Sequence, residues 1–198
     1  MHSTTFKTQR ANGEKKIVVC LSGASGAIYA KQLLDVLVPS PHRVAIVASE
    51  HAKQIWVDEV GGCLEQYDCP LYAVHDFTAP FASGSNVWDA CVIVPCSMGM
   101  LGRIAHGMAE DLIARCGDVF LKERRPLLLV PRETPFTLIH LDNMRALTLA
   151  GATILPASPS FYGRPRSIEE AVDTVVARIV DHLGIAYQPR TKRWGAER

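Results

Sequence analysis

The stretch KIVVCLSGASGAIYAKQLLDVL, residues 16–37, decides the fold. It begins with a β-branched run, residues 17–21, of the kind that forms a buried parallel strand. A turn of small residues follows at 22–26, and apolar residues then recur at roughly helical spacing through residue 37. Such a strand–turn–helix unit opens many nucleotide-binding sheets, because the helix N-terminus presents N–H groups to a phosphate. The turn is neither a GxGxxG fingerprint nor a Walker A motif, so by itself it is equally compatible with a plain tight turn.

The composition indicates one domain without a strongly charged partner. The chain has 198 residues, is 48% hydrophobic and carries a formal net charge of +1. This balance gives no electrostatic reason to expect nucleic acid or an anionic membrane, and no apolar run approaches the ~20 residues that span a bilayer. We expect residues 1–14 to be a disordered leader, residues 15–186 to form the domain and residues 187–198 to be a solvated tail.

The cysteines and histidines show no metal-binding spacing. None of the six cysteines forms a CxxC pair, and three lie in or beside apolar runs. The seven histidines are dispersed and contain no HExxH motif. This pattern favours reduced thiols in a cytoplasmic protein over disulfides, and no metal site is expected.

Five further strands are expected after the first, and they alternate with helices. This alternation predicts an α/β fold, a doubly wound and mainly parallel sheet in a single domain. Helices are expected over residues 50–60 and 104–123, and a capping box at Ser167 predicts the start of the last one. The expected strands cover residues 43–48, 71–74, 88–94, 126–130 and 153–155.

Polar residues and glycines follow several of the expected strands. Ser49 ends the second strand, where open α/β sheets bind ligands, although it is also a good helix N-cap. A second small-residue turn, residues 95–102, follows the fourth strand. Arg132 and Glu133 leave the fifth strand on a short proline-flanked connection, where they either face a ligand or pair in a structural ion network. We expect Thr134 to cap the helix that begins at the next residue.

Six segments resemble the UbiX-type flavin prenyltransferases, a family formerly known as 3-octaprenyl-4-hydroxybenzoate carboxy-lyases. The resemblance covers roughly residues 16–194, and its long motifs are far more specific than the glycine turn. In chain order the segments are GASGAIYA (23–30), PCS (95–97), LKERRPLLLVPRETP (121–135), HLDNM (140–144), GATILPASPSFYGRP (151–165) and VVARIVDHLGI (175–185).

The resemblance implies a flavodoxin-like Rossmann fold that binds FMN and assembles as a dodecamer, with active sites where subunits meet. It implies transfer of the dimethylallyl group of dimethylallyl phosphate to N5 and C6 of reduced FMN. The product, prenylated FMN, is the cofactor of UbiD-type decarboxylases, and no metal is required. Dimethylallyl pyrophosphate remains an alternative donor, and the decarboxylase that is served stays open.

The resemblance also implies roles for individual residues. Tyr162 and Arg178 would hold dimethylallyl phosphate, and Lys122 would lend it positive charge, as a departing phosphate requires. Glu133 and Glu59 are the implied acidic residues near the reacting flavin edge, with Glu133 as the acid/base. The implied FMN contacts are Gly23, Ala24, Ser25, Ser49, Ser97, Met98, Gly99, Met100 and Arg132.

One departure and two rival interpretations bear on this assignment. Met100 stands where the family usually has threonine, so a hydroxyl that would bind the flavin or a phosphate is missing, and a backbone N–H can serve in its place. A cysteine decarboxylase of the same fold would carry a PxMNxxMW-type segment, which is absent from the sequence. A non-catalytic FMN-binding subunit would not need the donor residues as well. Aromatic residues such as Trp88 are expected to line the pocket for an allylic cation.

Overall fold

The computed structural model describes residues 13–195. The expected leader therefore lies outside the described residues, apart from its last two positions. The last three residues of the expected tail lie outside them as well.

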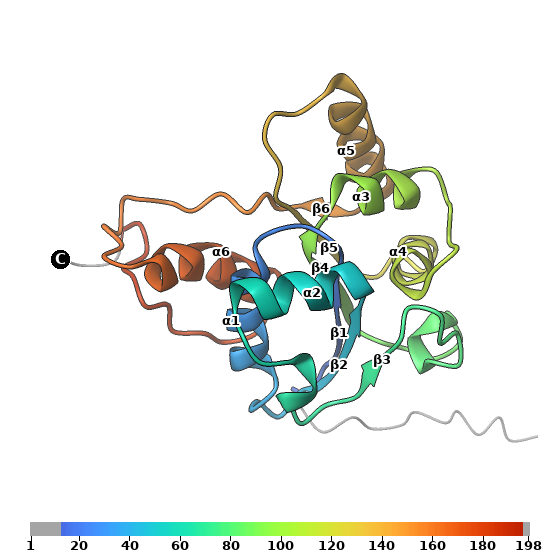
Figure 1. The fold of residues 1–198 in the computed structure, drawn as a ribbon, viewed down its shortest axis with the longest axis horizontal. Coiled ribbons are helices and arrows are strands. Elements are labelled where there is room, and N and C mark those ends of the chain that lie inside the picture. Colours follow the sequence, from blue (N-terminus) through green and yellow to red (C-terminus); the bar gives the residue numbers. More distant parts are fainter. Residues whose placement is uncertain (1–12, 196–198) are drawn as a thin grey trace, which may run out of the picture.

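Six strands form one parallel sheet in the order β3-β2-β1-β4-β5-β6 (Figure 1). The central strand β1 pairs with β2 on one side and with β4 on the other, so that Val19 lies between Ile46 and Val92. The arrangement confirms the doubly wound sheet predicted from the sequence. The strands are β1 (Lys16–Leu21), β2 (Arg43–Ala48), β3 (Leu71–Tyr72), β4 (Ala90–Cys96), β5 (Leu127–Pro131) and β6 (Thr153–Ile154).

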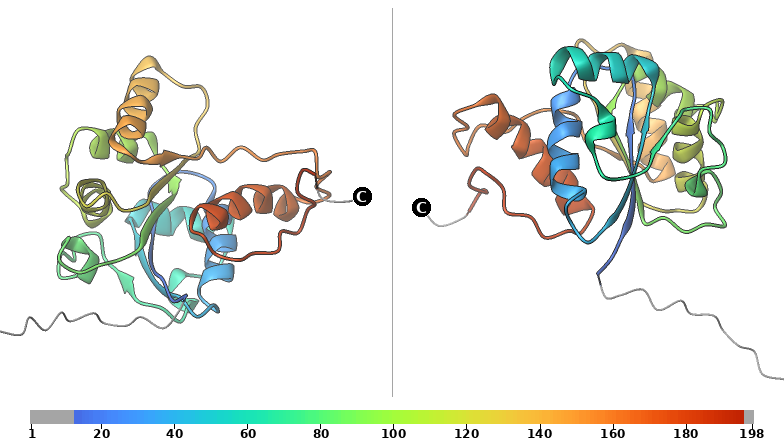
Figure 2. Two further views of the ribbon diagram at one scale, coloured as in Figure 1. Left: turned by 180° about the vertical axis from the view of Figure 1, so that it is seen from behind. Right: turned by 60° about the horizontal axis from the view of Figure 1, so that its bottom comes forward.

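Helices cover both faces of the sheet (Figure 2). α1, α2 and α6 pack on one face, where Val19 and Leu21 point, and α3, α4 and α5 pack on the other, where Val18 and Cys20 point. Strands covered on both faces are buried along their length, which explains their continuous β-branched runs. The helices are α1 (Ala27–Leu37), α2 (Glu50–Glu59), α3 (Met98–Ala105), α4 (Leu112–Lys122), α5 (Leu138–Ala150) and α6 (Ile168–His182), with short 3-10 turns at Leu64–Gln66 and Pro80–Ala82.

Two helix predictions were wrong. The helix expected over residues 104–123 is two helices, because Gly107 adopts a left-handed φ of 67° and Asp111 caps α4 by accepting the Ala114 N–H at 2.8 Å. The helix expected to start after Thr134 starts later, at Leu138. Its cap is Thr137, whose hydroxyl accepts from the N–H of His140 at 3.2 Å.

The strand order reverses between β1 and β4. β2 and β3 extend the sheet on one side of this point, and β5 and β6 extend it on the other. Open α/β sheets bind ligands in the crevice at the carboxyl ends of the strands that flank such a reversal. The two small-residue turns follow β1 and β4, so both lie at this crevice.

A search of residues 13–195 finds no helix with the length and apolar character that a membrane span needs.

Candidate cofactor and donor site

Ser22 joins the two turns at the crevice. Its hydroxyl donates to the Pro95 carbonyl oxygen at 3.0 Å and accepts the Ser97 N–H at 2.7 Å. The side chain is buried, so these bonds satisfy its polar group and fix the second turn against the first. The sequence interpretation missed this residue. A serine directly after a strand of apolar residues was the only local signal.

Glycines allow the first turn to pack closely. A Cβ added at Gly23 would lie 2.9 Å from the Cβ of His51, so the turn touches the start of α2. Gly26 has a left-handed φ of 112° at the N-cap of α1, a conformation that favours glycine. Of the other predicted contacts in this turn, Ala24 is buried and Ser25 is exposed.

Glu59 occupies the N-terminus of α1. Its Oε2 atom accepts the N–H groups of Gly26 and Ala27, each at 2.8 Å. Partial burial alone would raise the pKa of Glu59, but bonds from the Ser25 hydroxyl and these two N–H groups, with the charge of Arg132, lower it overall. In this structure Glu59 thus takes the Gly26 and Ala27 N–H groups, which leaves neither of them open to a phosphate. The same contacts place the Glu59 carboxylate beside the first turn, at the crevice.

Ser49 and Ser97 cap the helices that follow β2 and β4. The Ser49 hydroxyl accepts the N–H of Ala52 at 3.1 Å, and the Ser97 hydroxyl accepts the N–H of Met100 at 3.2 Å. The N-cap alternative for Ser49 is thus realised, and it leaves the residue at the ligand edge. The Met100 side chain is buried in the core, so only its backbone belongs to the turn.

The start of α3 is open to a ligand. In the part of the chain that the structure describes, the N–H groups of Met98 and Gly99 have no hydrogen-bond partner. A Cβ added at Gly99 would meet nothing within 4 Å. Free N–H groups at a helix start facing open space are what an anionic phosphate group requires.

Arg132 reaches from the end of β5 to the first turn, where its Nε donates to the carbonyl oxygen of Ser25 at 3.0 Å. The neighbouring Glu133 is exposed, and one of its carboxylate oxygens accepts the N–H of Thr134 at 2.9 Å. Among the described residues Glu133 forms no ion pair, so the alternative of a structural ion network is not realised for this carboxylate within the chain.

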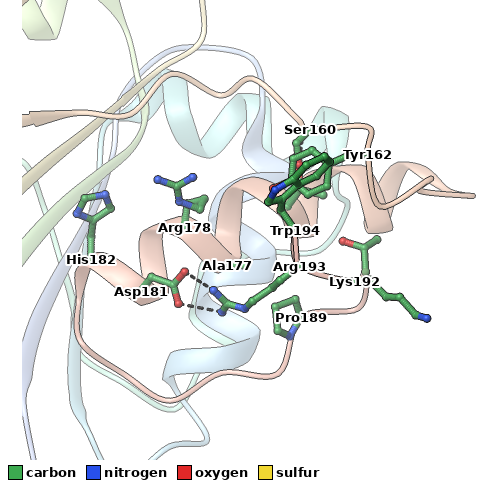
Figure 3. Close-up of a pocket in the computed structure, with 12 residues that line it drawn as sticks. Ser160, Tyr162, Ala177, Arg178, Asp181, His182, Pro189, Lys192, Arg193 and Trp194 are labelled. Atoms are coloured by element: carbon green, nitrogen blue, oxygen red, sulfur yellow. Dashed lines mark hydrogen bonds and ion pairs between the residues drawn. The ribbon is translucent and has the colours of Figure 1, made fainter. Parts of the chain in front are cut away.

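A separate pocket lies between α6 and the C-terminal segment (Figure 3). Its volume is about 480 Å³, and Tyr162, Arg178 and Trp194 line it. Arg178 is exposed and forms no hydrogen bond or ion pair within residues 13–195, so its charge is available to an anion. None of the predicted cofactor residues lines this pocket. The structure thus brings together the two residues predicted to hold the donor, away from the cofactor turns.

Trp194 is the aromatic residue that the sequence interpretation missed. Its ring meets that of Tyr162 edge to face, with centroids 5.6 Å apart. Trp88, which was expected to line the pocket, is instead buried on the face of the sheet that α3, α4 and α5 cover. It packs there on Phe81, with ring centroids 5.1 Å apart. The local signal for Trp194 was a lone tryptophan in an otherwise basic and polar tail.

Lys122 lies apart from both groups. It ends α4, which leads into the start of β5, whereas Arg132 follows the end of β5. The two residues therefore lie at opposite ends of the strands: Lys122 at the amino ends and Arg132 at the carboxyl ends. Lys122 is exposed there and pairs with Glu123 at 2.8 Å. A single subunit does not bring this lysine to the cofactor turns.

Comparisons with known proteins show the family of the chain. The flavoprotein family model matches residues 5–180. A flavin prenyltransferase UbiX of Methanocaldococcus jannaschii is 45% identical over 183 residues, which cover 91% of this chain and 98% of the relative. The crystal structure of AnUbiX (PadA1) in complex with FMN and dimethylallyl pyrophosphate matches with a TM-score of 0.88 and 37% identity, covering 93% of this chain and 100% of that chain.

A second solved structure adds an assembly. The dodecameric FMN-dependent UbiX-like decarboxylase from Escherichia coli O157:H7 matches with a TM-score of 0.87 and 36% identity, covering 91% of this chain and 100% of that one. The fold matches over nearly the whole length of both solved structures. The chain belongs to the flavoprotein family, among its UbiX-type flavin prenyltransferases.

Proposed function

We propose that this chain is a flavin prenyltransferase that joins the dimethylallyl group of dimethylallyl phosphate to N5 and C6 of reduced FMN. The observation that carries the proposal is the pairing, in a chain of this family, of an anion-ready crevice with a second cationic and aromatic pocket. Binding of FMN alone would need only the crevice. The solved relative that contains both FMN and dimethylallyl pyrophosphate supports the same conclusion.

The crevice fits the FMN that the family binds. The open N–H groups of Met98 and Gly99 suit its phosphate, and Arg132 adds a positive charge beside the first turn. Ser49 and Ser97 would place hydroxyl groups at the same edge. When it is bound, reduced FMN supplies the nucleophilic ring atoms of the reaction. No metal takes part in the proposed reaction.

The second pocket fits the donor. As the bond to phosphate breaks, Arg178 and the Tyr162 hydroxyl would stabilise the growing negative charge, with Lys122 as a further cation. The facing rings of Tyr162 and Trp194 provide π-faces for the positive allylic group. Glu133, exposed and without a charged partner in the described chain, would move the proton, and Glu59 is the second carboxylate at the crevice.

A complete site requires more than one copy of the chain. Lys122 lies at the opposite end of the strands from Arg132, and the donor pocket shares no lining residue with the cofactor turns. An apolar surface on and before α5 offers a place for a second copy: Phe136, Leu138, Ile139, Leu141 and Leu149 are all exposed. We propose a homo-oligomer, a dodecamer by analogy with the solved relative, in which neighbouring subunits complete each site.

Two further parts of the proposal concern the cellular setting. The prenylated flavin would be delivered to a UbiD-type decarboxylase, because a modified cofactor needs an enzyme that uses it. We place the reaction in the cytoplasm, which is supported by free thiols at all six cysteines.

An anaerobic assay tests the function. Purified protein is mixed with reduced FMN and either dimethylallyl phosphate or the pyrophosphate, and the mass of the released flavin is measured. We expect wild type to give a flavin heavier by the prenyl group, and Arg178→Gln to give far less of it. Arg43→Gln should form as much prenylated flavin as wild type, because Arg43 is an exposed arginine at the start of β2, away from the carboxyl ends of the strands. Unmodified FMN with both donors, or a bound dinucleotide in place of FMN, would refute the proposal.

A further inference from the structure

The C-terminal segment is tied to α6 by two aspartates. Asp181 accepts two bonds from the guanidinium of Arg193, with Nη1–Oδ2 at 2.6 Å and Nη2–Oδ1 at 2.9 Å (Figure 3). Asp173, which is fully buried, accepts from the Arg190 N–H at 2.7 Å and from the Tyr187 hydroxyl. Among residues 13–195, every hydrogen-bond partner of these two carboxylates lies beyond α6, so the helix holds the segment at two points.

The outer tie determines where Trp194 lies. Trp194 follows Arg193 directly, and 83% of its surface is exposed. Its edge-to-face contact with Tyr162 is the one ring contact that it makes within residues 13–195. Because so little of the ring is buried, its position over the pocket depends on the anchored arginine beside it.

The same tie also leaves Arg178 available. Arg178 and Asp181 are three residues apart on α6, a spacing at which opposite charges form ion pairs. The pKa of Asp181 is lowered, chiefly by the hydrogen bonds from Arg193. Burial opposes this shift, and the charges of Arg193 and Arg178 add to it. Both carboxylate oxygens of Asp181 are nevertheless taken by Arg193, and Arg178 has no hydrogen bond within the described chain. The pair with Arg193 therefore competes with a pair that would neutralise Arg178.

We propose that the Asp181–Arg193 ion pair is a positioning device for the prenyl donor, which holds Trp194 against Tyr162 and keeps Arg178 free for the anionic end of the ligand. The inference rests on the proposed function, since it takes the anionic ligand to be dimethylallyl phosphate. Asp181 and Arg193 are positioning residues, because both act through Arg178 and Trp194.

Two single variants separate the two effects. Arg193→Gln removes the tie and releases Asp181 to pair with Arg178, whereas Asp181→Asn removes the tie but leaves Arg178 free. An exposed ion pair contributes little, so we expect the KM for dimethylallyl phosphate to rise about fivefold in Arg193→Gln and about twofold in Asp181→Asn. The affinity for FMN should stay unchanged in both. In the double variant the KM should fall back to that of Asp181→Asn, and Arg193→Lys should restore most of the wild-type value.

A second measurement is independent of activity. Amide hydrogen exchange of residues 186–195 should be faster in both variants than in wild type, because the segment has lost one of its two ties. Glu14→Gln is the matched control: it breaks an exposed arginine–carboxylate pair, Arg43–Glu14 at 2.6 Å, in which the carboxylate side chain is 32% exposed against 36% for Asp181. It should change neither the exchange nor the KM.

The possible failures are distinguishable. A wild type that transfers no prenyl group from either donor would refute the proposed function and, with it, the role of the pair in donor binding. A wild type with normal turnover, in which Arg193→Gln raises the KM no more than Asp181→Asn, would refute the inference alone. Unchanged hydrogen exchange in both variants would likewise show that the pair does not hold the segment.

Discussion

Replacing Gly23 by alanine tests how tightly the first turn packs on α2. The added Cβ would lie 2.9 Å from the Cβ of His51, an atom bonded directly to the backbone, so no rotamer change relieves the contact and the turn or the helix must move. Overpacking costs ~1–3 kcal/mol, and alanine recovers ~0.4–1 kcal/mol through the unfolded chain. The net loss of about 1–2 kcal/mol corresponds to a melting temperature roughly 2–8 °C lower for a domain of this size.

Gly99→Ala is the matched control. Gly99 lies in the second turn, and a Cβ there meets nothing within 4 Å. Inside a helix alanine is favoured over glycine by up to ~1 kcal/mol, so this variant should be as stable as wild type or more stable. Thermal unfolding of the FMN-free proteins, followed by circular dichroism, measures both effects. Titration with FMN should show weaker binding in Gly23→Ala, because the displaced turn borders the crevice.

The two melting temperatures decide the question. If Gly23→Ala unfolds at or above the wild-type temperature, the turn has room for a side chain and is not held against α2. If Gly99→Ala is destabilised as strongly as Gly23→Ala, the start of α3 has no room for a side chain, and the open space described there is refuted.

Three further predictions concern catalysis, pH and assembly. Glu133→Gln should keep FMN binding but slow prenylation in a single turnover by ~10²–10⁴-fold; a near wild-type rate would make Glu59 the next candidate. Glu59→Gln should lower stability near neutral pH by ~1 kcal/mol, as for a lost cap. Because folding lowers the pKa of this carboxyl, its contribution to stability is present above the unfolded value of 4.5 and is lost as the pH falls through the folded value. The melting temperatures of wild type and Glu59→Gln, measured from pH 3 to 7, should therefore converge at the acid end. A difference that stays constant with pH would contradict this. Leu138→Asp combined with Ile139→Asp should reduce the mass measured by light scattering, whereas Val87→Asp, another exposed apolar position, should not; an unchanged mass in the double variant would remove this surface as the interface.

The sequence by itself determined most of the secondary structure and the identity of the crevice. The expected strand over residues 43–48 and the expected helix over residues 27–37 have the same bounds in the structure. Such segments are predictable because a strand buried on both faces must be apolar throughout, and a helix needs a cap and an apolar stripe. The turns after β1 and β4 meet because the carboxyl ends of parallel strands lie at one edge. The break between α3 and α4 was missed, since its local signals, Gly107 and Asp111, are also tolerated inside helices.

Only the tertiary structure decided how distant segments combine. It places Lys122 at the opposite end of the strands from Arg132, although only a short strand separates them in the chain. It ties Ser22 to the second turn and Arg193 back to α6, and so makes a pocket wall from a segment that composition alone describes as a solvated tail. The physical reason is that these hydrogen bonds and ion pairs are not encoded by any local period. They depend on strand order and on which surface each helix covers, and these are decided by packing of the whole core.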